Sequence, residues 1–415
     1  MTVRYLNKIK TINDPVYGFI TLPGAFFFDV MEHPWFQRLR RIKQLGLTHY
    51  VYPSAHHTRF QHALGSMHLM LQAIKTLRSR GADISTEEAD GAALAIFLHD
   101  IGHGPFSHTL ERSIVPGCPH EELSSLFVKA FNDQFNGQLS LALDIFTGTY
   151  PRKFLHQLVS SQLDMDRLDY LSRDSFFTGV AEGTINTDRI IHVMTLNKDE
   201  LEVEPKGIHS IEKFLIARRL MYWQVYLHKA VLAADQMLMS VLRRARFLGE
   251  SGVTLFSTPA LSPFLSEPVP NGCFTANSLW LERFANLDDS DIMASLKSWI
   301  NHPDPILSRM SENLISRRLI RAEMQHEPFD PGYIESVRRE TAKKLKLDPA
   351  DTGYWVHSDR IDNDAYLPGV DRINIKMGDG RIMDISDASE QLNVTILPST
   401  VSRYVLYHPK EINIY

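Results

Sequence analysis

The feature that most restricts the fold of this chain is an apolar run that ends in a dense group of titratable residues. Residues 92–98 are all apolar, and the overlapping stretch FLHDIGHGPFSHTLE, residues 97–111, holds three histidines and two acids. An apolar run of this kind predicts a helix buried in an α-helical core. We therefore expect the helix to carry its histidines and acids to a site at its exposed end.

Helical periodicity extends over most of the first 250 residues. Phe36, Leu39, Ile42 and Leu45 recur at three-residue steps, which suits one face of a helix. Longer amphipathic patterns predict helices over residues 62–77, 85–98, 154–173 and 211–248, the last of them long. Ahead of these helices, residues 3–22 mix β-branched and aromatic residues with turn signals, which predicts a short hairpin or an extended arm.

The composition changes after residue 250. Residues 251–273 are rich in Ser, Pro and Gly, which indicates a loop or a domain boundary. Helical patterns return over residues 279–326 and 331–345, and the β-branched runs RINIKM, NVTILP and RYVLYH predict strands within 352–415. We expect a mainly α core over residues 1–250 and an α+β region over 251–415 that covers the active site or builds an oligomer.

The charge balance and the cysteine count exclude several classes of protein. A net charge of −5 gives no overall attraction to nucleic acid or to an anionic membrane, so an anion site must be a local cluster of arginines and lysines. Cys118 and Cys273 are too few for a disulfide framework, which fits a reducing compartment. The stretch MTVRYLNKIKTIND lacks the apolar segment of a secretory signal, and no run of about 18 apolar residues follows. We expect a cytoplasmic protein.

Several histidines and aspartates have the chemistry of ligands for a divalent metal ion. His99 and Asp100 point about 100° apart on a helix, and both reach one ion if the helix ends there and Gly102 lets the backbone turn. Two further ligands must come from elsewhere, and the segments HTRFQHALG and SQLDMDRLDYLSRD offer His62 and Asp166. The alternative is that these are ordinary core or surface residues, because a chain with 18 histidines forms close pairs by chance.

Five sequence blocks in a fixed order carry a resemblance to a known family. They are INDPVYGFI, FQRLRRIKQLG, HTRFQHALG, HDIGHGPFSHTLE and DMDRLDYLSRD. Together they resemble the HD-domain phosphohydrolase superfamily, and more closely its branch of deoxynucleoside triphosphate triphosphohydrolases. The resemblance is clear over residues 10–175, weaker to about residue 245 and thin beyond. The branch includes an enzyme with a sterile-alpha-motif domain, and because the blocks begin near residue 10 we expect no such domain in this chain.

The resemblance implies an HD-domain helical core with an N-terminal arm and one bound metal ion. Its ligands would be His62, His99, Asp100 and Asp166. Two imidazoles and two carboxylates suit Mn, Fe, Mg, Zn or Ni, so the sequence does not select the ion. An ion in such a site holds a phosphate oxygen and lowers the pKa of bound water toward about 7.

The resemblance also implies a catalytic group beside the metal. His103 stands four residues after His99 and matches a residue that acts in acid–base or nucleophilic chemistry at the α-phosphate. Glu111 stands where a relative has Asp, and a carboxylate there would set the tautomer of His103. His120 matches another histidine of the catalytic cluster and His108 a phosphate contact; the alternative for both is an exposed loop histidine.

Substrate-binding residues follow from the same resemblance. Cations for the phosphates, sugar contacts and groups that exclude a 2′-hydroxyl would come from Gln44, Leu45, Arg59, Arg167, Tyr170, Asp174, Arg218 and Tyr226. Arg167 replaces a lysine of the family. The triplet Tyr222-Trp223-Gln224 replaces a histidine and two arginines, so the base or sugar preference of this chain is open. Without the surrounding blocks, Tyr170 and Tyr226 would be interpreted as core aromatics.

A regulatory site for a guanine nucleotide at a subunit interface is implied as well. The matching residues are Lys10, Glu32, Gln37 and Arg40. The alternative is that FQRLRRIKQLG is an amphipathic helix with a solvated basic face formed by Arg38, Arg40, Arg41 and Lys43. With regulation, GTP or dGTP would favour an assembled oligomer, and we expect a homodimer or homotetramer.

The preferred hypothesis is a metal-dependent enzyme that releases triphosphate from a dNTP. A second hypothesis is another HD-domain reaction, by a nucleotide monophosphatase or a phosphodiesterase. A third is a nucleotide-binding regulator without turnover, against which the complete set of candidate ligands and His103 argue.

Overall fold

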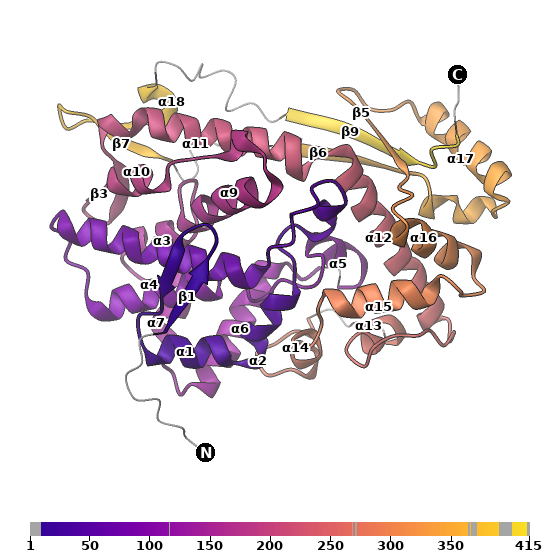
Figure 1. Ribbon diagram of the computed structural model, residues 1–415, viewed down its shortest axis with the longest axis horizontal. Helices are drawn as coiled ribbons and strands as arrows, with labels where there is room; N and C mark the ends of the chain where they lie inside the picture. The colour runs from indigo at the N-terminus through magenta and orange to yellow at the C-terminus, as the bar shows by residue number, and fades with distance from the viewer. Residues whose placement is uncertain are drawn as a thin grey trace.

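Helices form most of the molecule, and the prediction of a mainly α fold is confirmed. The computed structural model describes residues 10–115, 117–267, 269, 272–363, 366, 372–389 and 401–412. Figure 1 shows α3 (Arg59–Ser79), α4 (Thr86–Leu98), α7 (Ser140–Phe146) and α9 (Met165–Thr178) on one side of the molecule. On the other side lie α15 (Asp289–Trp299), α16 (Pro305–Ile315) and α17 (Pro331–Leu345).

Shorter helices complete both sides. They are α1 (Ala25–Glu32), α5 (His108–Ser113), α6 (His120–Gln134), α8 (Lys153–Val159), α10 (Thr187–His192), α13 (Ser262–Ser266), α14 (Leu279–Phe284) and α18 (Ile385–Ala388).

The apolar run of the sequence forms the centre of the core. Helix α4 begins at a capping box, in which Ser85 and Glu88 each satisfy a backbone N–H of the other, and it is buried from Ala89 to Leu98 apart from Asp90. It packs against α3 and α7. The helix ends at Leu98, and the chain turns there, so His103 does not continue the helical face of His99. The expected exposed end is wrong: residues 100–107 are buried, and His99 is half-buried.

The N-terminal arm is a hairpin in its described part. Strand β1 (Thr11–Asp14) pairs antiparallel with β2 (Gly18–Thr21), in register Thr11 to Thr21. The predicted helix around Phe36 is two short pieces, α2 (Pro34–Gln37) and the 3₁₀ helix η1 (Arg38–Arg41). A three-residue apolar repeat suits a 3₁₀ helix, which has three residues per turn.

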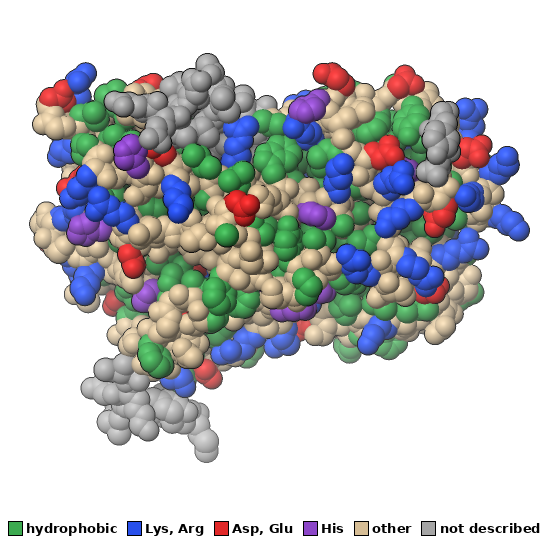
Figure 2. Space-filling model, turned by 45° about the horizontal axis from the view of Figure 1, so that its top comes forward, with side chains coloured by type: hydrophobic (Ala, Val, Ile, Leu, Met, Phe, Trp, Pro, Cys, Tyr) green, Lys and Arg blue, Asp and Glu red, His purple; other side chains and the backbone are tan. Residues whose placement is uncertain are grey.

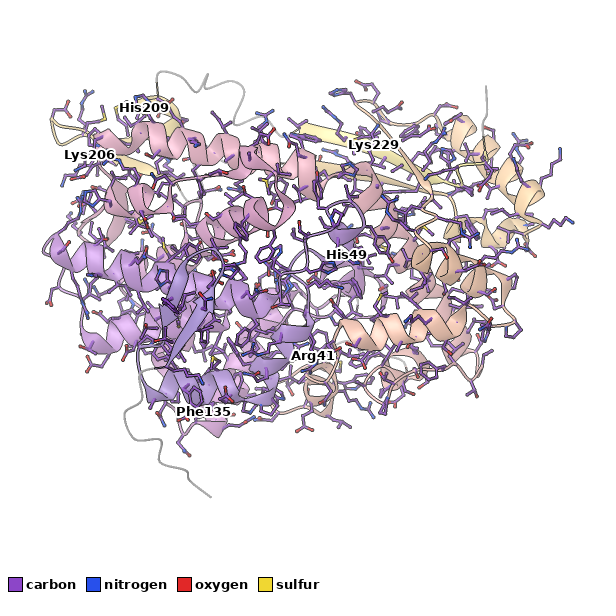
Figure 3. The ribbon with its side chains drawn as sticks, in the orientation of Figure 1. Arg41, His49, Phe135, Lys206, His209 and Lys229 are labelled. Carbon is purple, nitrogen blue, oxygen red and sulfur yellow. The ribbon has the colours of Figure 1, made fainter. Side chains whose placement is uncertain are left out.

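The expected solvated basic face is wrong for Arg38. This side chain is fully buried, and its guanidinium donates to the carbonyls of Ile101 at 2.7 Å, Leu287 at 3.1 Å and Phe284 at 3.4 Å. Arg41 remains on the surface and pairs with Asp288 at the amino end of α15 (Figure 3). Arg38 therefore joins the early part of the chain to a segment almost 250 residues later.

Two predicted long helices are interrupted. The helix over 154–173 is divided into α8 and α9, because Asp164 caps α9 by accepting from Arg167 N at 2.7 Å. The helix over 211–248 is divided into α11 (Ile208–Met221) and α12 (Lys229–Glu250) by a π-helical turn at Tyr222–Tyr226. His228 caps α12 through its Nδ1, which accepts from Ala230 N. The pattern over 279–326 ends in a strand, β5 (Arg321–Gln325).

The C-terminal strands join two separate sheets. The predicted runs RINIKM and RYVLYH contain β7 (Asn374–Lys376) and β9 (Val401–His408), whereas NVTILP lies outside the described residues. Strand β9 lies between β5 and β6 (His357–Asn363). Strand β7 pairs with β8 (Ile382–Asp384) and with β4 (Glu200–Val203), which together with β3 (Met194–Asn197) was not predicted.

Acidic and basic side chains are interspersed over the face drawn in Figure 2. Within the described residues, no helix combines the length and the apolar character needed to cross a membrane.

Candidate active site

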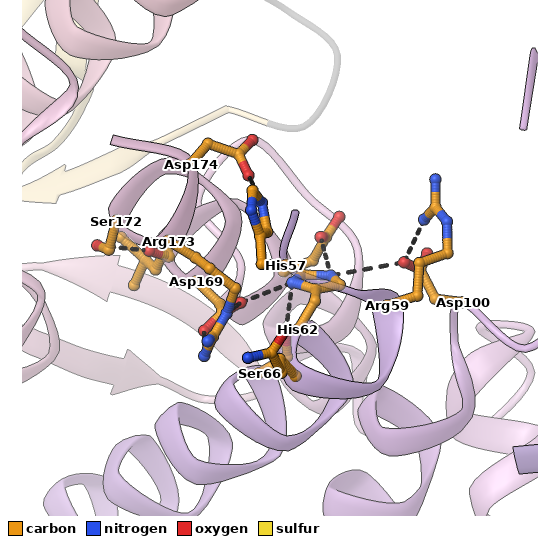
Figure 4. Close-up of polar contacts among 12 residues, drawn as sticks. His57, Arg59, His62, Ser66, Asp100, Asp169, Ser172, Arg173 and Asp174 are labelled. Atoms are coloured by element: carbon orange, nitrogen blue, oxygen red, sulfur yellow. Dashed lines mark hydrogen bonds and ion pairs between the residues drawn. The ribbon is translucent and has the colours of Figure 1, made fainter. Parts of the chain in front are cut away.

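Four residues predicted as metal ligands lie together where α3, the end of α4 and α9 meet. The Nε2 atom of His62 is 3.2 Å from Nε2 of His99 and 3.1 Å from Oδ1 of Asp166. Asp100 reaches both imidazoles, at 3.7 Å from His62 and 3.4 Å from His99. His62 and Asp100 are buried, and part of this group is drawn in Figure 4.

The hydrogen bonds made by Nδ1 of His62 and of His99 decide which ring nitrogen is available to a cation. Nδ1 of His99 is 2.6 Å from the carbonyl oxygen of Ile96, which can only accept, so Nδ1 carries the proton. Nδ1 of His62 is 2.6 Å from a carboxylate oxygen of Asp169 (Figure 4). Nε2 is therefore the nitrogen of each ring that faces the other ring, at 3.2 Å, and a cation bound between the rings would take the place of a proton there.

The electrostatics of the group also favour a bound cation. Burial alone would lower the pKa of His62, but hydrogen bonds to Asp166 and Asp169 raise it to about 10. Burial would raise the pKa of Asp166, and the two histidines hold it below its usual range. A site that retains positive charge so strongly, with imidazole and carboxylate donors, fits a divalent metal ion.

Charged side chains behind the candidate ligands hold His62 in place. Asp169 accepts from Arg173, whose guanidinium also donates to Asp14 of the hairpin at 2.8 Å. Gly65 permits this packing, because a Cβ there would lie 1.9 Å from Oδ1 of Asp169. Sequence reasoning did not single out Asp169; its position three residues after Asp166, on the same helix face, was the available signal.

A second group of titratable residues adjoins the first. The rings of His103 and His120 stack with centroids 3.8 Å apart, and Nδ1 of His120 is 3.0 Å from Glu111. Nε2 of His103 is 3.2 Å from Oδ1 of Asp100. Burial, followed by the nearby Arg59 guanidinium, holds the pKa of His103 well below its usual range, so its imidazole is neutral. The side chain of His108 lies outside the described part of the structure.

The turn that carries His103 is held from three sides. Gly102 lies against α6, where a Cβ would be 2.2 Å from the backbone nitrogen of Ser124. Phe106 and Ser107 both have positive φ angles, of 51° and 38°, which are costly for residues with a Cβ. The carboxylate of Asp289 accepts from the backbone nitrogen of Phe106 at 3.3 Å, so the C-terminal half of the chain contributes to this turn.

The predicted phosphate-binding cations lie around these two groups. Arg59 donates to Asp100 at 2.5 Å and to Ser107 at 2.7 Å. Arg167 donates to the carbonyl of Ser161 at 2.6 Å, and the buried Arg218 donates to Gln162 at 3.0 Å.

A cavity of ≈ 470 Å³ opens beside Arg59. Gln44, Leu45 and Tyr226 line it, as predicted sugar contacts should. Tyr222 of the Tyr222-Trp223-Gln224 triplet also lines this cavity. The ring of Trp223 instead lies against the guanidinium of Arg403, whose central carbon is 5.0 Å from the ring centroid.

Asp174 is fixed by two partners. Its carboxylate is 2.7 Å from Nε2 of His57 and accepts from the hydroxyl of Tyr226 at 2.6 Å. The ring of Tyr170 lies edge-on to that of Tyr226, with centroids 6.3 Å apart.

The predicted regulatory residues share one surface. Nε of Arg40 donates to Gln37 at 2.8 Å, and its guanidinium lies 3.5 Å from the centre of the Phe60 ring. Burial lowers the pKa of Arg40, and the nearby Glu32 opposes that effect. Lys10 and Glu32 are exposed.

Comparison with known proteins identifies the family. The HD domain matches residues 59–174 and the HD associated region matches residues 185–254. An uncharacterized protein of Bacillus subtilis, YwfO, is 30% identical over 421 aligned positions, which cover 98% of this chain and 94% of that protein. The chain belongs to the HD-domain phosphohydrolase superfamily. His99 and Asp100 lie within the matched residues 59–174.

Two further relatives of this HD-domain protein are informative. A crystal structure of a phosphohydrolase from Bacteroides thetaiotaomicron has a TM-score of 0.94 and 49% sequence identity, covering 97% of this chain and 100% of that one. The human deoxynucleoside triphosphate triphosphohydrolase SAMHD1 is 26% identical over 285 aligned positions, which cover 58% of this chain and 45% of the human protein. The chain therefore spans less than half of the human enzyme, and the shared activity class is hydrolysis of phosphate compounds.

Proposed function

We propose that the protein hydrolyses a dNTP to a deoxynucleoside and inorganic triphosphate, with one divalent metal ion held by His62, His99, Asp100 and Asp166. The observation that carries the proposal is the cage of two imidazoles and two carboxylates, with the neutral His103 on Asp100 at 3.2 Å. The five ordered sequence blocks and the name of the human relative support the triphosphate as substrate.

The reaction transfers the α-phosphorus from the 5′-oxygen of the sugar to water. When bound, the metal ion supplies positive charge against the phosphate oxygens. A neutral His103 can take the proton of the attacking water and later give a proton to the departing 5′-oxygen. Glu111 holds His120 against the ring of His103, which restricts how that ring is oriented. Because the basic groups Arg59, Arg167 and Arg218 surround this place, a triphosphate chain would find charge-assisted partners there.

The sugar would lie beside Tyr170, Asp174 and Tyr226. Asp174 is held on both sides, by His57 and by Tyr226, so its carboxylate is a rigid acceptor for a sugar hydroxyl. A rigid polar group and a close aromatic ring discriminate between sugars by leaving the wrong hydroxyl unpaired or crowded.

Regulation by GTP or dGTP is part of the proposal. Glu32 offers an acceptor for the N–H groups of guanine, and Lys10 and Arg40 offer cations for its phosphates. The exposed positions of Lys10, Glu32 and Arg40 support a nucleotide at a surface that a second subunit could cover. Sedimentation with and without GTP tests this; a monomer under both conditions would contradict an assembled, nucleotide-dependent oligomer.

The Tyr222-Trp223-Gln224 triplet favours a second candidate, an HD-domain enzyme with a different nucleotide substrate. Tyr222 lines the cavity in place of a basic group, so the cavity carries less positive charge than the resemblance implies.

Product analysis separates the candidates. The protein is incubated with each of the four dNTPs, with Mn²⁺ or Mg²⁺ and with or without GTP. Triphosphate and nucleoside support the proposal. If no dNTP is cleaved, the protein is incubated with nucleoside monophosphates and cyclic nucleotides. Orthophosphate or a 5′-nucleotide would then support a monophosphatase or phosphodiesterase, and the absence of any product would support a non-catalytic regulator.

A further inference from the structure

The cavity beside Arg59 continues well beyond the sugar contacts. One face of α12, formed by Val231, Leu232, Asp235, Gln236 and Met239, lines its far part. Opposite α12 it is lined by Asp359, Ile361 and Tyr407, from β6 and β9 of the C-terminal sheet. Asp235 lies seven residues after the cap of α12, roughly 10 Å along the helix axis. The predicted sugar contact Tyr226 and Asp235 line the same cavity.

Asp235 is unusual among the carboxylates of this cavity. Asp359 lies at the rim, 3.7 Å from Arg112, with both side chains well exposed. For Asp235, the described residues provide no hydrogen bond and no ion pair, and burial raises its pKa to about 7. Tyr407 lines the same cavity as Asp235, and burial raises its pKa, as do the charges of Asp359 and Asp235.

The walls around Asp235 suit a flat aromatic ligand. Ile361, Met239 and the Tyr407 ring supply apolar and aromatic surface, and Asp235 supplies an acceptor without a protein donor. Ligand sites commonly combine mostly apolar walls with a few polar groups that fix orientation. Asp235 is half-buried, and its carboxylate can accept from the N–H donors of a ligand in the cavity.

We propose that Asp235 reads the base of the substrate and selects guanine, so that dGTP is the preferred dNTP. This assignment rests on the proposed function. A carboxylate accepts two parallel hydrogen bonds, one at each oxygen. Guanine alone among the four bases presents two adjacent N–H donors on one edge, N1–H and the 2-amino group. Adenine and cytosine present one amino group beside an acceptor, and thymine presents one N–H between two carbonyl groups.

The test compares kcat/KM for the four dNTPs in the full-length protein and in Asp235→Asn. We expect dGTP to be preferred by roughly tenfold to a hundredfold. Asp235→Asn should lower kcat/KM for dGTP by roughly tenfold or more and change the other three by less than about twofold, because an amide nitrogen cannot accept from guanine. The matched control is Glu250→Gln, at the exposed end of the same helix and outside the cavity lining, which should leave the preference unchanged. If Asp235→Asn does not fold, Asp235→Ser takes its place.

The outcomes separate this assignment from the proposed reaction. Equal kcat/KM for all four dNTPs, a preference for another base, or an equal loss for all four in Asp235→Asn overturns the assignment and leaves the reaction standing. Binding is measured in parallel by calorimetry with the His103→Ala variant. If no dNTP is cleaved by the unmodified protein, but dGTP binds this variant preferentially and Asp235→Asn removes the preference, the assignment stands and the reaction falls. The absence of both cleavage and binding overturns both.

Discussion

Asp289 gives the molecule a stability that depends on pH. It is the first residue of α15 and is buried, and its two carboxylate oxygens accept from the backbone nitrogens of Lys43 at 3.0 Å and Phe106 at 3.3 Å. Burial raises its pKa to about 6, although these backbone hydrogen bonds oppose the rise. The substitution Asp289→Asn keeps the size of the side chain and removes the titration.

Proton linkage gives the sign of the change in stability with pH. Because the pKa of Asp289 is higher in the folded protein than the value of 3.8 for an unperturbed carboxyl, the folded state binds the proton more tightly. The resulting stabilisation is complete below the unfolded pKa and is lost as the pH rises through about 6. Between the unfolded pKa of 3.8 and the folded pKa of about 6, protonation of Asp289 contributes about 3 kcal/mol to the free energy of unfolding. About 1.3 kcal/mol of this contribution is lost between pH 5 and pH 7.

Urea unfolding of both proteins at pH 5 and pH 7 measures this effect. The free energy of unfolding of the unmodified protein, relative to Asp289→Asn, should fall by about 1.3 kcal/mol over that interval. The control is Asp330→Asn, the same change at an exposed helix cap of α17, for which we expect less than about 0.5 kcal/mol. The same pH dependence in the protein and in Asp289→Asn would refute the reasoning.

Four other changes test the site and the core around it. His103→Ala should lower turnover by about 10² or more and leave metal content unchanged by elemental analysis; a near-normal rate would remove His103 from the mechanism. Asp166→Ala should lose the metal, so stoichiometric metal in this variant would contradict the ligand set. Arg38→Met removes the donor to the buried carbonyls of Ile101 and Leu287, whereas the Phe284 carbonyl keeps its hydrogen bond from Leu287 N. It should lower the free energy of unfolding by about 3 kcal/mol; a loss below about 1 kcal/mol would contradict this. Gly65→Ala should lower the free energy of unfolding by about 2 kcal/mol or more, measured by thermal unfolding, because its Cβ would strike Asp169. An unchanged unfolding midpoint would show that α3 and α9 can move apart at little cost in free energy.

Much of the fold followed from local patterns. The capped, apolar α4 and the hairpin of β1 and β2 were predicted because their signals lie within a few residues of each other. The breaks at Asp164 and His228 were missed, because each depends on a side chain that caps the next helix within a continuing helical pattern. Strand β4 was missed because its partner β7 is far away in the sequence.

The candidate site also contains residues that the sequence predicts and residues that it does not. The candidate ligands could be named because they lie in short blocks with a fixed order, and the structure brings their nitrogens and oxygens together. Asp289 and Asp235 were missed, since no periodicity connects a carboxylate to a turn or a cavity formed by a distant segment. The buried Arg38 was misinterpreted for the same reason: its carbonyl partners near residue 285 give no signal around residue 38.

The pairing of β4 with β7 has a consequence for protein synthesis. Glu202 in β4 aligns with Asn374 in β7, so a ribosome that has just made β4 must add about 170 further residues before its partner exists. At ordinary elongation rates, the edge of β4 that pairs with β7 has no partner for roughly 10 to 30 s. Exposed strand edges invite pairing between chains, and charged residues on them discourage it. Glu200 and Glu202 occupy two of the four positions of β4, so the growing chain carries its own protection against aggregation during that interval.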